Sequence, residues 1–343
     1  MEDNKRFSVL RPLTSQELKF YTIELINFFN PLNNKKNREY LGLQIYEGTI
    51  RPLKLMDFFS YIKQKYNFES LRFKDSIVML VYKLINANAL IYAGSEMKGS
   101  PPLCNTYYSM NELTNLQSNN QEFWLGKILG TKYLRDVYEK YIVRIEGEDI
   151  NGVNATGSGI LIDSNIILTC GHNLNDITNH RCFIGDMQLE IIEIKPHCKY
   201  DIGIIKTQPI LGIDSFPYFG QPKNLDKTLT LGYPPLRGMR EATLIAQSGE
   251  INAIARDILN IENITISSIT RPGNSGGPVI SEEGYIVGIV VNSTNSVQRI
   301  SCDKETRNEN ISIPFYNAIS SNEIGKIIKE IDSNVQINYE NYE

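Results

Sequence analysis

The 343-residue sequence predicts two domains, a mainly helical one over residues 1–135 and a β-rich one over residues 136–334, followed by a tail at 335–343. Apolar residues recur at helical spacing in the first part, whereas the second part holds short apolar runs typical of strands. The charge changes at the same point. Residues 1–135 carry 18 Lys and Arg against 12 Asp and Glu, and the rest carries 17 against 27. These differences support a domain boundary near residue 135.

Helical signals begin early in the first domain. Thr14 with Glu17 three residues later is typical of a capped helix start, and Pro31 is expected to end this helix. Apolar residues then recur at helical spacing after Pro52, and two later segments have the composition of strands. The further elements expected are a helix after Pro52, a helix over residues 74–86, strands over residues 89–92 and 106–109, and a helix over residues 121–138.

Three helices followed by a hairpin are the outline of a winged helix, and positive charge in such a domain points to nucleic acid. The third helix is mixed in charge, with Lys74 and Lys83 but also Asp75. Because a helix that follows phosphates needs a denser basic run, we favour an adaptor or regulatory domain that binds a protein partner or another copy of the chain. Nucleic-acid binding by residues 1–135 stays an alternative.

The segment from Gly273 to Pro278, Gly-Asn-Ser-Gly-Gly-Pro, places one serine among residues that leave backbone amides uncovered. Glycine adopts backbone angles that other residues resist, so the amides of Gly273 and Ser275 can point together at a negatively charged oxygen. Ser275 is therefore the candidate nucleophile, and these two amides are the candidate oxyanion hole.

A serine is a weak nucleophile and needs a base, together with a group that orients the base. His172 directly follows an apolar strand, turn and strand over residues 159–168, and Asp201 opens a second apolar run. A loop histidine or a solvated aspartate is common by itself. Together with Ser275, however, they have the chemistry of a catalytic triad in which His172 is the base and Asp201 orients it.

The chain order His172, Asp201, Ser275 and its compact spacing resemble the HtrA/Deg-like bacterial branch of the trypsin-like serine proteases, over residues ~140–330. The resemblance implies the chymotrypsin fold, an all-β pair of six-stranded antiparallel barrels with the active site between them. It also implies peptide-bond hydrolysis through an acyl-enzyme, with no metal or organic cofactor. The further motifs that match are Gly157-Ser-Gly159, Leu231-Gly-Tyr-Pro-Pro235 and Gly288-Ile-Val-Val-Asn292.

The resemblance also indicates a substrate pocket. Ile269 stands where trypsins carry the aspartate that binds basic side chains, and Thr270 lies beside it. Because a buried cation without a counterion is disfavoured, cleavage after Lys or Arg is not expected. Asn292 and Ser293 are expected to form a small, neutral pocket wall. Small or medium aliphatic residues are therefore expected before the scissile bond.

Two departures from the family pattern concern regulation. Asn274 precedes the serine, where trypsin-type zymogens carry the aspartate that pairs with a new N-terminus, so maturation of that kind is not expected. No counterpart of the C-terminal PDZ domain of HtrA proteases is expected, because residues 317–331 are expected to form the closing helix and the tail to fray. Regulation is therefore assigned to residues 1–135.

The sequence opens without a secretory signal and contains no apolar run of about 18 residues, so a cytoplasmic location is expected. Five cysteines at irregular spacing are typical of reduced thiols. Zinc is a weaker alternative, because zinc ligands usually have two to four residues between them, whereas the pairs in this chain have one or none. These pairs are Cys170 with His172, His180 with Cys182, and His197 with Cys198.

Three functions stay open on the sequence. The leading hypothesis is a cytoplasmic serine endopeptidase that is recruited or regulated by its N-terminal domain, an arrangement that resembles bacterial stress and antiphage-defence proteases. The second is an inactive protease fold that binds a partner, and the third is a nucleic-acid-binding regulator with an attached protease. Reaction with a fluorophosphonate separates the first from the second. Salt-dependent DNA binding by residues 1–135 would identify the third.

Overall fold

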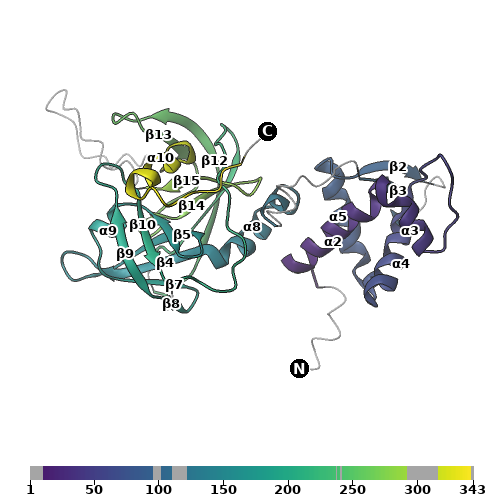
Figure 1. The fold of residues 1–343 in the computed structure, drawn as a ribbon, viewed down its shortest axis with the longest axis horizontal. Coiled ribbons are helices and arrows are strands. Elements are labelled where there is room, and N and C mark those ends of the chain that lie inside the picture. Colours follow the sequence, from purple (N-terminus) through teal and green to yellow (C-terminus); the bar gives the residue numbers. More distant parts are fainter. Residues whose placement is uncertain are drawn as a thin grey trace. The chain divides into compact units, whose positions relative to one another are not determined.

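The chain folds into two compact units, Met1–Leu129 and Gly130–Glu343 (Figure 1). The expected boundary after residue 135 falls inside α8 (Thr131–Tyr138), which belongs to the second unit. There the Tyr138 hydroxyl donates to the Gly284 carbonyl oxygen over 2.9 Å. No helix in the described part of the chain has the length and apolarity needed to cross a bilayer. The computed structural model describes residues 11–95, 102–109, 122–236, 238–239, 242–291 and 316–340.

Helix α2 (Ser15–Phe29) begins at the predicted cap. The Thr14 hydroxyl accepts a hydrogen bond from the Glu17 amide over 3.3 Å, and the Glu17 carboxylate accepts one from the Thr14 amide over 2.9 Å. This pair satisfies amides that a helix start leaves without partners. The predicted third helix is confirmed as α5 (Lys74–Asn86). The other helices in the described part of the first unit are η1 (Pro31–Asn33), α3 (Asn34–Tyr40), α4 (Leu55–Tyr66), η2 (Ser70–Phe73), η3 (Pro102–Cys104), η4 (Phe123–Leu125) and α7 (Gly126–Leu129).

The single helix expected over residues 121–138 is wrong in extent. The helical segment that contains α7 ends at Leu129, and α8 starts at Thr131. Gly130, between them, has a φ of 87°, which is outside the helical region and favours glycine. Residue 121 lies outside the described residues. The break divides one amphipathic segment between the two units.

A three-stranded antiparallel sheet of order β1-β3-β2 completes the first unit. β2 (Ile91–Ser95) and β3 (Asn105–Tyr108) overlap the two expected strands, although β2 begins two residues later than expected, and β1 (Leu53–Lys54) adds a third. Aromatic packing joins the helices to this sheet. The ring centroids of Phe29 in α2 and Tyr107 in β3 lie 5.4 Å apart, in an edge-to-face arrangement.

The first sheet of the second unit has seven strands in the order β8-β7-β4-β5-β6-β10-β9, so the expected number of six is wrong. The short additional strand arises from a tight hairpin. Ile184 pairs with Met187, and Gly185 in the turn has a φ of 56°. The strands are β4 (Ile142–Glu148), β5 (Asn154–Asp163), β6 (Ile166–Thr169), β7 (Thr178–Ile184), β8 (Met187–Leu189), β9 (Ile191–Pro196) and β10 (Gly203–Thr207).

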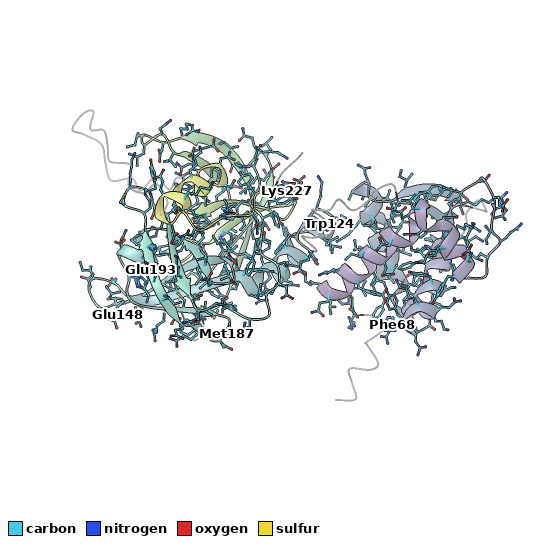
Figure 2. All side chains as sticks on the ribbon, viewed as in Figure 1. Phe68, Trp124, Glu148, Met187, Glu193 and Lys227 are labelled. Atoms are coloured by element: carbon cyan, nitrogen blue, oxygen red, sulfur yellow. The ribbon has the colours of Figure 1, made fainter. Side chains whose placement is uncertain are left out.

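The second sheet closes into a six-stranded barrel of order β11-β12-β13-β16-β15-β14, as expected. Closure leaves no strand edge unpaired. Ile251, Ile264 and Val279 are fully buried inside it, whereas Lys227 at the start of β11 is exposed (Figure 2). The strands are β11 (Lys227–Gly232), β12 (Ile245–Arg256), β13 (Glu262–Ile266), β14 (Pro278–Ser281), β15 (Ile286–Val290) and β16 (Tyr316–Ser320).

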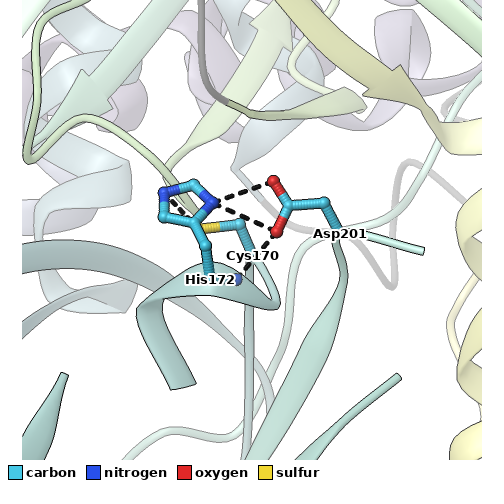
Figure 3. Close-up of side chains that lie close together, drawn as sticks. All are labelled: Cys170, His172 and Asp201. Carbon is cyan, nitrogen blue, oxygen red and sulfur yellow. Dashed lines mark hydrogen bonds and ion pairs between the residues drawn. The ribbon is translucent and has the colours of Figure 1, made fainter. Parts of the chain in front are cut away.

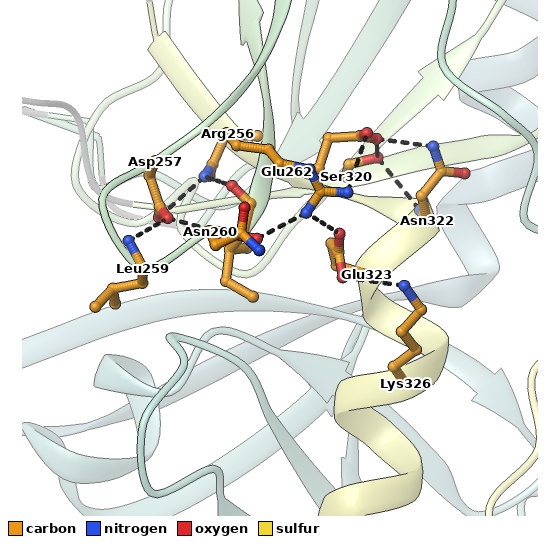
Figure 4. Close-up of polar contacts among 11 residues, drawn as sticks. Arg256, Asp257, Leu259, Asn260, Glu262, Ser320, Asn322, Glu323 and Lys326 are labelled. Atoms are coloured by element: carbon orange, nitrogen blue, oxygen red, sulfur yellow. Dashed lines mark hydrogen bonds and ion pairs between the residues drawn. The ribbon is translucent and has the colours of Figure 1, made fainter.

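The helix expected over residues 317–331 is wrong at its start, because residues 316–320 form β16 and pair with β13 and β15. Helix α10 (Ser321–Ile331) begins only after β16 ends. Arg256 Nη1 in β12 donates to Glu323 Oε1 over 2.9 Å and joins the barrel to this helix (Figure 4). Pairing with two barrel strands therefore overrides the helical continuity of the local sequence.

The expected fraying of the tail is wrong for residues 335–340. The Glu340 amide donates to the Phe219 carbonyl oxygen over 2.8 Å, and the Phe219 amide donates to the Asn338 carbonyl oxygen over the same distance. Backbone bonds therefore hold this segment on the second unit. Residues 341–343 lie outside the described part of the chain.

We expect Glu17→Gln to destabilise the first unit at neutral pH. The hydrogen bond from Arg11, and then those from Thr14, lower the pKa of Glu17 from 4.5 to about 2. Because this folded-state pKa lies below the unfolded one, the carboxylate stabilises the fold above about pH 5, and the contribution is lost as the pH falls toward about 2. The free energy of unfolding should be about 1 kcal/mol lower in the variant than in the wild type at about pH 7. At about pH 2 the two values should be nearly equal. An equal loss in the exposed control Gln16→Ala would contradict this.

Candidate active site

The pairing of β6 with β10 brings His172 and Asp201 together. The two strands run antiparallel, with Gly203 opposite Thr169. His172 follows the end of β6 and Asp201 precedes the start of β10, so both residues leave the sheet at the same edge. His172 is the first residue of the short helix α9 (His172–Asn175).

Asp201 holds the His172 ring through its Nδ1 atom (Figure 3). Nδ1 lies 2.8 Å from Asp201 Oδ2 and 3.1 Å from Oδ1, and the His172 amide donates to Oδ1 over 2.8 Å. Burial raises the pKa of Asp201, but hydrogen bonds from His172 and from the Gly171 amide outweigh burial and hold this pKa below its usual value. A charged carboxylate therefore orients the ring and leaves Nε2 as the nitrogen that can accept a proton.

Nε2 of His172 faces Cys170, whose Sγ atom lies 3.5 Å away (Figure 3). Cys170 is fully buried. Burial, and then the charge of Asp201, raise the pKa of this thiol well above its usual value. The thiol is therefore neutral at physiological pH, which excludes it as a thiolate nucleophile. Sequence reasoning considered Cys170 only as a zinc ligand and missed this contact with the ring.

Ser275 lies in a tight turn before β14 and is 5% exposed. The amides of Gly276 and Gly277 in this turn donate to backbone carbonyl oxygens over 2.7 Å and 2.9 Å. In the described part of the chain, the amides of Gly273 and Ser275 have no such partner, and these are the two predicted for an oxyanion hole. The φ of Gly273 is 97°, a value that favours glycine.

Hydrogen bonds from the first sheet hold the main chain of the serine turn. The Ser275 carbonyl oxygen accepts from the Ser158 amide over 2.9 Å and from Asn173 Nδ2 over 2.8 Å. The Ser158 hydroxyl donates to the Gly273 carbonyl oxygen over 2.6 Å. Asn173 Nδ2 also donates to Thr169 Oγ1 over 3.0 Å. Because Asn173 directly follows the histidine, these bonds set the serine turn relative to the histidine helix. Within the described residues, no hydrogen bond joins Ser275 Oγ to the His172 ring. The bonds from Ser158 and Asn173 therefore connect the serine turn to the histidine helix.

Two glycines allow this close approach. A Cβ atom at Gly276 would overlap the Ser158 carbonyl oxygen and Thr169 Oγ1, and the φ of Gly276 is 84°. A Cβ atom at Gly157 would overlap the Asn173 side-chain amide. Sequence reasoning missed the roles of Ser158 and Asn173. The available signals were the place of the serine inside the Gly-Ser-Gly motif and that of the asparagine next to the histidine.

The residues predicted for the substrate pocket differ in environment. Ile269 is 50% exposed, and Thr270 is buried. Ser268, next to them, is also buried, and its hydroxyl is bonded to Thr230 Oγ1 over 2.9 Å. Asn292 and Ser293, predicted for the pocket wall, lie outside the described residues.

The cysteine and histidine pairs do not gather into one zinc site within the described residues. His180 and His197 each contact an oxygen atom through Nε2 at 3.0 Å. Cys170, His172 and Asp201 have possible ligand atoms within 4.8 Å of one another. The sulfur faces Nε2 of the ring and the carboxylate faces Nδ1 (Figure 3). An ion shared by all three would therefore replace the hydrogen bond between Nδ1 and the carboxylate.

We expect Asn173→Ala to loosen the serine turn. The Asn173 amide is buried, and its loss removes one of the two donors to the Ser275 carbonyl oxygen. The unfolding free energy of the second unit should fall by about 1–3 kcal/mol, and hydrogen exchange of the turn amides should accelerate. Asn175→Ala, at an exposed position of the same helix, is the matched control and should change stability by less than about 0.5 kcal/mol. Equal effects of both substitutions would contradict the proposed link.

Residues 157–289 match the sequence profile of the trypsin-like peptidase domain. A protein of Synechocystis sp. with the name putative serine protease HhoA is 30% identical to this chain over 150 residues, which make up 39% of this chain and 36% of that protein. The chain therefore spans about a third of the length of this curated relative.

Solved structures that resemble part of the chain include the active form of the Rv3671c protease from M. tuberculosis. It is 17% identical with a TM-score of 0.46, and the match covers 58% of this chain and 84% of that one. A serine endoprotease from Yersinia pestis is 18% identical with a TM-score of 0.46, and the match covers 59% of this chain and 66% of that one.

The matched residues include His172, Asp201 and Ser275. Residues 157–289 are therefore similar to a trypsin-like peptidase domain.

Proposed function

We propose that this protein hydrolyses peptide bonds with His172, Asp201 and Ser275 as its catalytic triad. The observation that carries the proposal is the 2.8 Å hydrogen bond between His172 Nδ1 and Asp201 Oδ2. It orients the ring, favours the tautomer with a proton on Nδ1 and stabilises the imidazolium that forms during reaction. The match of residues 157–289 to a peptidase domain supports Ser275 as the nucleophile.

In this mechanism Ser275 Oγ attacks the scissile carbonyl carbon while His172 Nε2 takes the hydroxyl proton. The ring then gives this proton to the leaving amine, and water releases the acyl group by the same steps. Nε2 must change its contact from Cys170 Sγ to the serine hydroxyl when substrate binds. A neutral thiol forms only weak hydrogen bonds, so this exchange is easy.

The amides of Gly273 and Ser275 are the proposed oxyanion hole. Both lack a backbone acceptor in the described part of the chain, and the Ser158 hydroxyl holds the Gly273 carbonyl oxygen. Donors that are fixed before the reaction need no reorganisation when charge develops, and each such donor is worth about 10²–10³-fold in kcat.

The proposed substrates are proteins with a small or medium aliphatic residue before the scissile bond. Ile269 offers no carboxylate to a basic side chain, and its half-exposed position leaves it accessible to a substrate. A Lys or Arg side chain placed there would lose hydration without gaining a counterion.

For the first unit we propose a winged-helix-like adaptor or regulatory role. The three longest helices before the β2 and β3 hairpin are α2, α4 and α5, with the shorter α3 between α2 and α4, and the sheet order β1-β3-β2 is compatible with this outline. We place the protein in the cytoplasm, since the four described cysteines are free thiols. A protease in that compartment needs restraint, and stress or antiphage defence is a setting in which a partner would release it.

Ser275→Ala should abolish reaction with a serine-directed fluorophosphonate. The reagent needs an activated hydroxyl next to an oxyanion hole, and the wild-type chain should label with one equivalent. Because Ser275 is held through its main chain, the variant should keep the wild-type unfolding temperature. Ser267→Ala, at an exposed serine directly after β13, is the control that should still label. Equal labelling of Ser275→Ala and the wild type would overturn the assignment.

Asp201→Asn should lower kcat by about 10⁴-fold with little change in KM. The amide favours the wrong tautomer of His172 and no longer stabilises the cation. The test is the rate at which the wild type and the variant hydrolyse a peptide with an aliphatic residue before the scissile bond. Unfolding curves of the two proteins are the control for folding. A loss below about tenfold would show that another group orients the ring.

The regulatory role is tested by comparing the full chain with residues 130–343, which start at the boundary of the second unit and retain α8. If the first unit restrains or recruits, the two proteins should differ by more than about fivefold, either in peptide hydrolysis or in cleavage of a protein substrate. The unfolding transition of the shorter chain is the control. Equal rates on both kinds of substrate would contradict regulation by the first unit.

A further inference from the structure

A histidine outside the proposed triad closes the loop that presents Asp201. His197 lies between β9 and β10, and its side chain is 7% exposed. Its Nδ1 atom accepts hydrogen bonds from the backbone amides of Lys199 over 3.1 Å and Tyr200 over 3.0 Å. The rings of His197 and Tyr200 are stacked, with centroids 4.8 Å apart and an interplanar angle of 16°. An aspartate or asparagine commonly closes a turn in this way, and here an imidazole does so.

These contacts fix the tautomer of the ring. A backbone amide can only donate, so Nδ1 of His197, which accepts from two amides, carries no proton. Nε2 therefore carries the hydrogen and donates it to Glu330 Oε2 over 3.0 Å. The neutral ring satisfies all three bonds at once, whereas a proton on Nδ1 would face two donors.

The turn is also tied to Asp201 through the main chain. The His197 amide donates to the Ile202 carbonyl oxygen over 2.8 Å, and the Ile202 amide donates to the Tyr200 carbonyl oxygen over 2.7 Å. Asp201 lies between these bonded residues, so a change in the turn moves its carboxylate relative to His172. A misplacement of about 1 Å can lower turnover by about 10²-fold.

We propose that neutral His197 is a positioning residue for Asp201, and that a proton on its Nδ1 atom opens the turn and lowers peptidase activity at acidic pH. This inference rests on the proposed function, because it assigns His197 a part in the peptidase reaction. Histidine is the side chain that changes charge between about pH 5 and 8. Asparagine would close the same turn without titrating, so the consequence of having histidine here can be measured.

The groups around the His197 ring have opposing effects on its protonation. The Glu330 carboxylate at the end of α10 faces Nε2 and favours the protonated ring, whereas the two amides that point at Nδ1 oppose protonation. The titratable neighbours in the loop itself are Cys198, Lys199 and Tyr200. The charges on β9, β10 and the segment after α10 are paired with one another, and they are Glu193, Lys195, Lys206 and Asp332.

The first test compares the full chain with His197→Asn and His197→Ala, using a peptide with an aliphatic residue before the scissile bond. At about pH 8, His197→Asn should keep kcat/KM within about threefold of the wild type, because the asparagine side chain accepts from the same two amides. His197→Ala should lose about 10²-fold, and the loss should lie in kcat, since His197 does not bind substrate in this proposal.

The acid limb of the pH profile separates positioning from a structural role. If a proton on Nδ1 of His197 opens the turn, log(kcat/KM) should fall more steeply toward acidic pH in the wild type than in His197→Asn. Glu330→Gln should shift this acidic loss of activity to lower pH, because the charged acceptor of the Nε2 hydrogen bond is lost. Cys198→Ser, at an exposed position of the same loop, is the matched control and should leave the limb unchanged.

A measurement without turnover keeps this inference distinct from the proposed function. In full-length Ser275→Ala with isotope-labelled histidines, nuclear magnetic resonance should show a His197 ring protonated at Nε2 alone at neutral pH. Adding His197→Asn to this protein identifies the signal by its loss. The Nδ1 proton signal of His172, which reports the bond to Asp201, should persist with His197→Asn and weaken with His197→Ala.

Two results would overturn the inference: a His197 ring protonated at Nδ1 at neutral pH, or acid limbs of equal slope in the wild type and His197→Asn. Absence of fluorophosphonate labelling in the wild type would instead contradict the proposed function. The response of the His172 signal to the two His197 substitutions would then still decide whether His197 positions Asp201.

Discussion

The candidate site depends on hydrogen bonds that join two separate sheets. His172 and Asp201 leave the seven-stranded sheet, whereas Ser275 precedes a strand of the closed barrel. Ser158 and Asn173 connect the two by donating to main-chain carbonyl oxygens of the serine turn. Because these acceptors belong to the backbone, the alignment does not depend on the serine side chain. The glycines at the contact are as necessary as the donors, since a Cβ atom there would separate the sheets.

The His172 ring lies between a charged carboxylate, Asp201, and a neutral thiol, Cys170. Asp201 stays charged because the hydrogen bonds it accepts outweigh its burial, and Cys170 stays neutral because burial and the nearby negative charge act together. The ring of His172 therefore has a fixed anion at Nδ1 and a weak, uncharged neighbour at Nε2. This arrangement favours proton uptake at Nε2 without a competing thiolate, as a general base requires.

The sequence predicted the features whose signals are local or follow from chain order. The capped start of α2, the limits of α5 and the closeness of His172 to Asp201 are of this kind. Prediction from the sequence was wrong where the structure of a segment depends on partners that are distant in the chain. Residues 317–320 of β16 have the local pattern of a helix, because their pairing with β13 and β15 leaves no local signal, and the two-residue strand β1 exists only through pairing with β3. The bond from Asn173 to Ser275 spans 102 positions, which no local pattern reports.

The reactivity of the buried Cys170 thiol can report local opening of the structure around His172. A reagent such as a maleimide reaches a fully buried sulfur only when the surrounding structure opens, and it reacts with the thiolate, which burial suppresses in the closed state. Cys198, exposed in the neighbouring loop, reacts without any opening and calibrates the reagent. The ratio of the alkylation rates of Cys170 and Cys198 therefore measures how often the structure around His172 opens, without a substrate or a mutation.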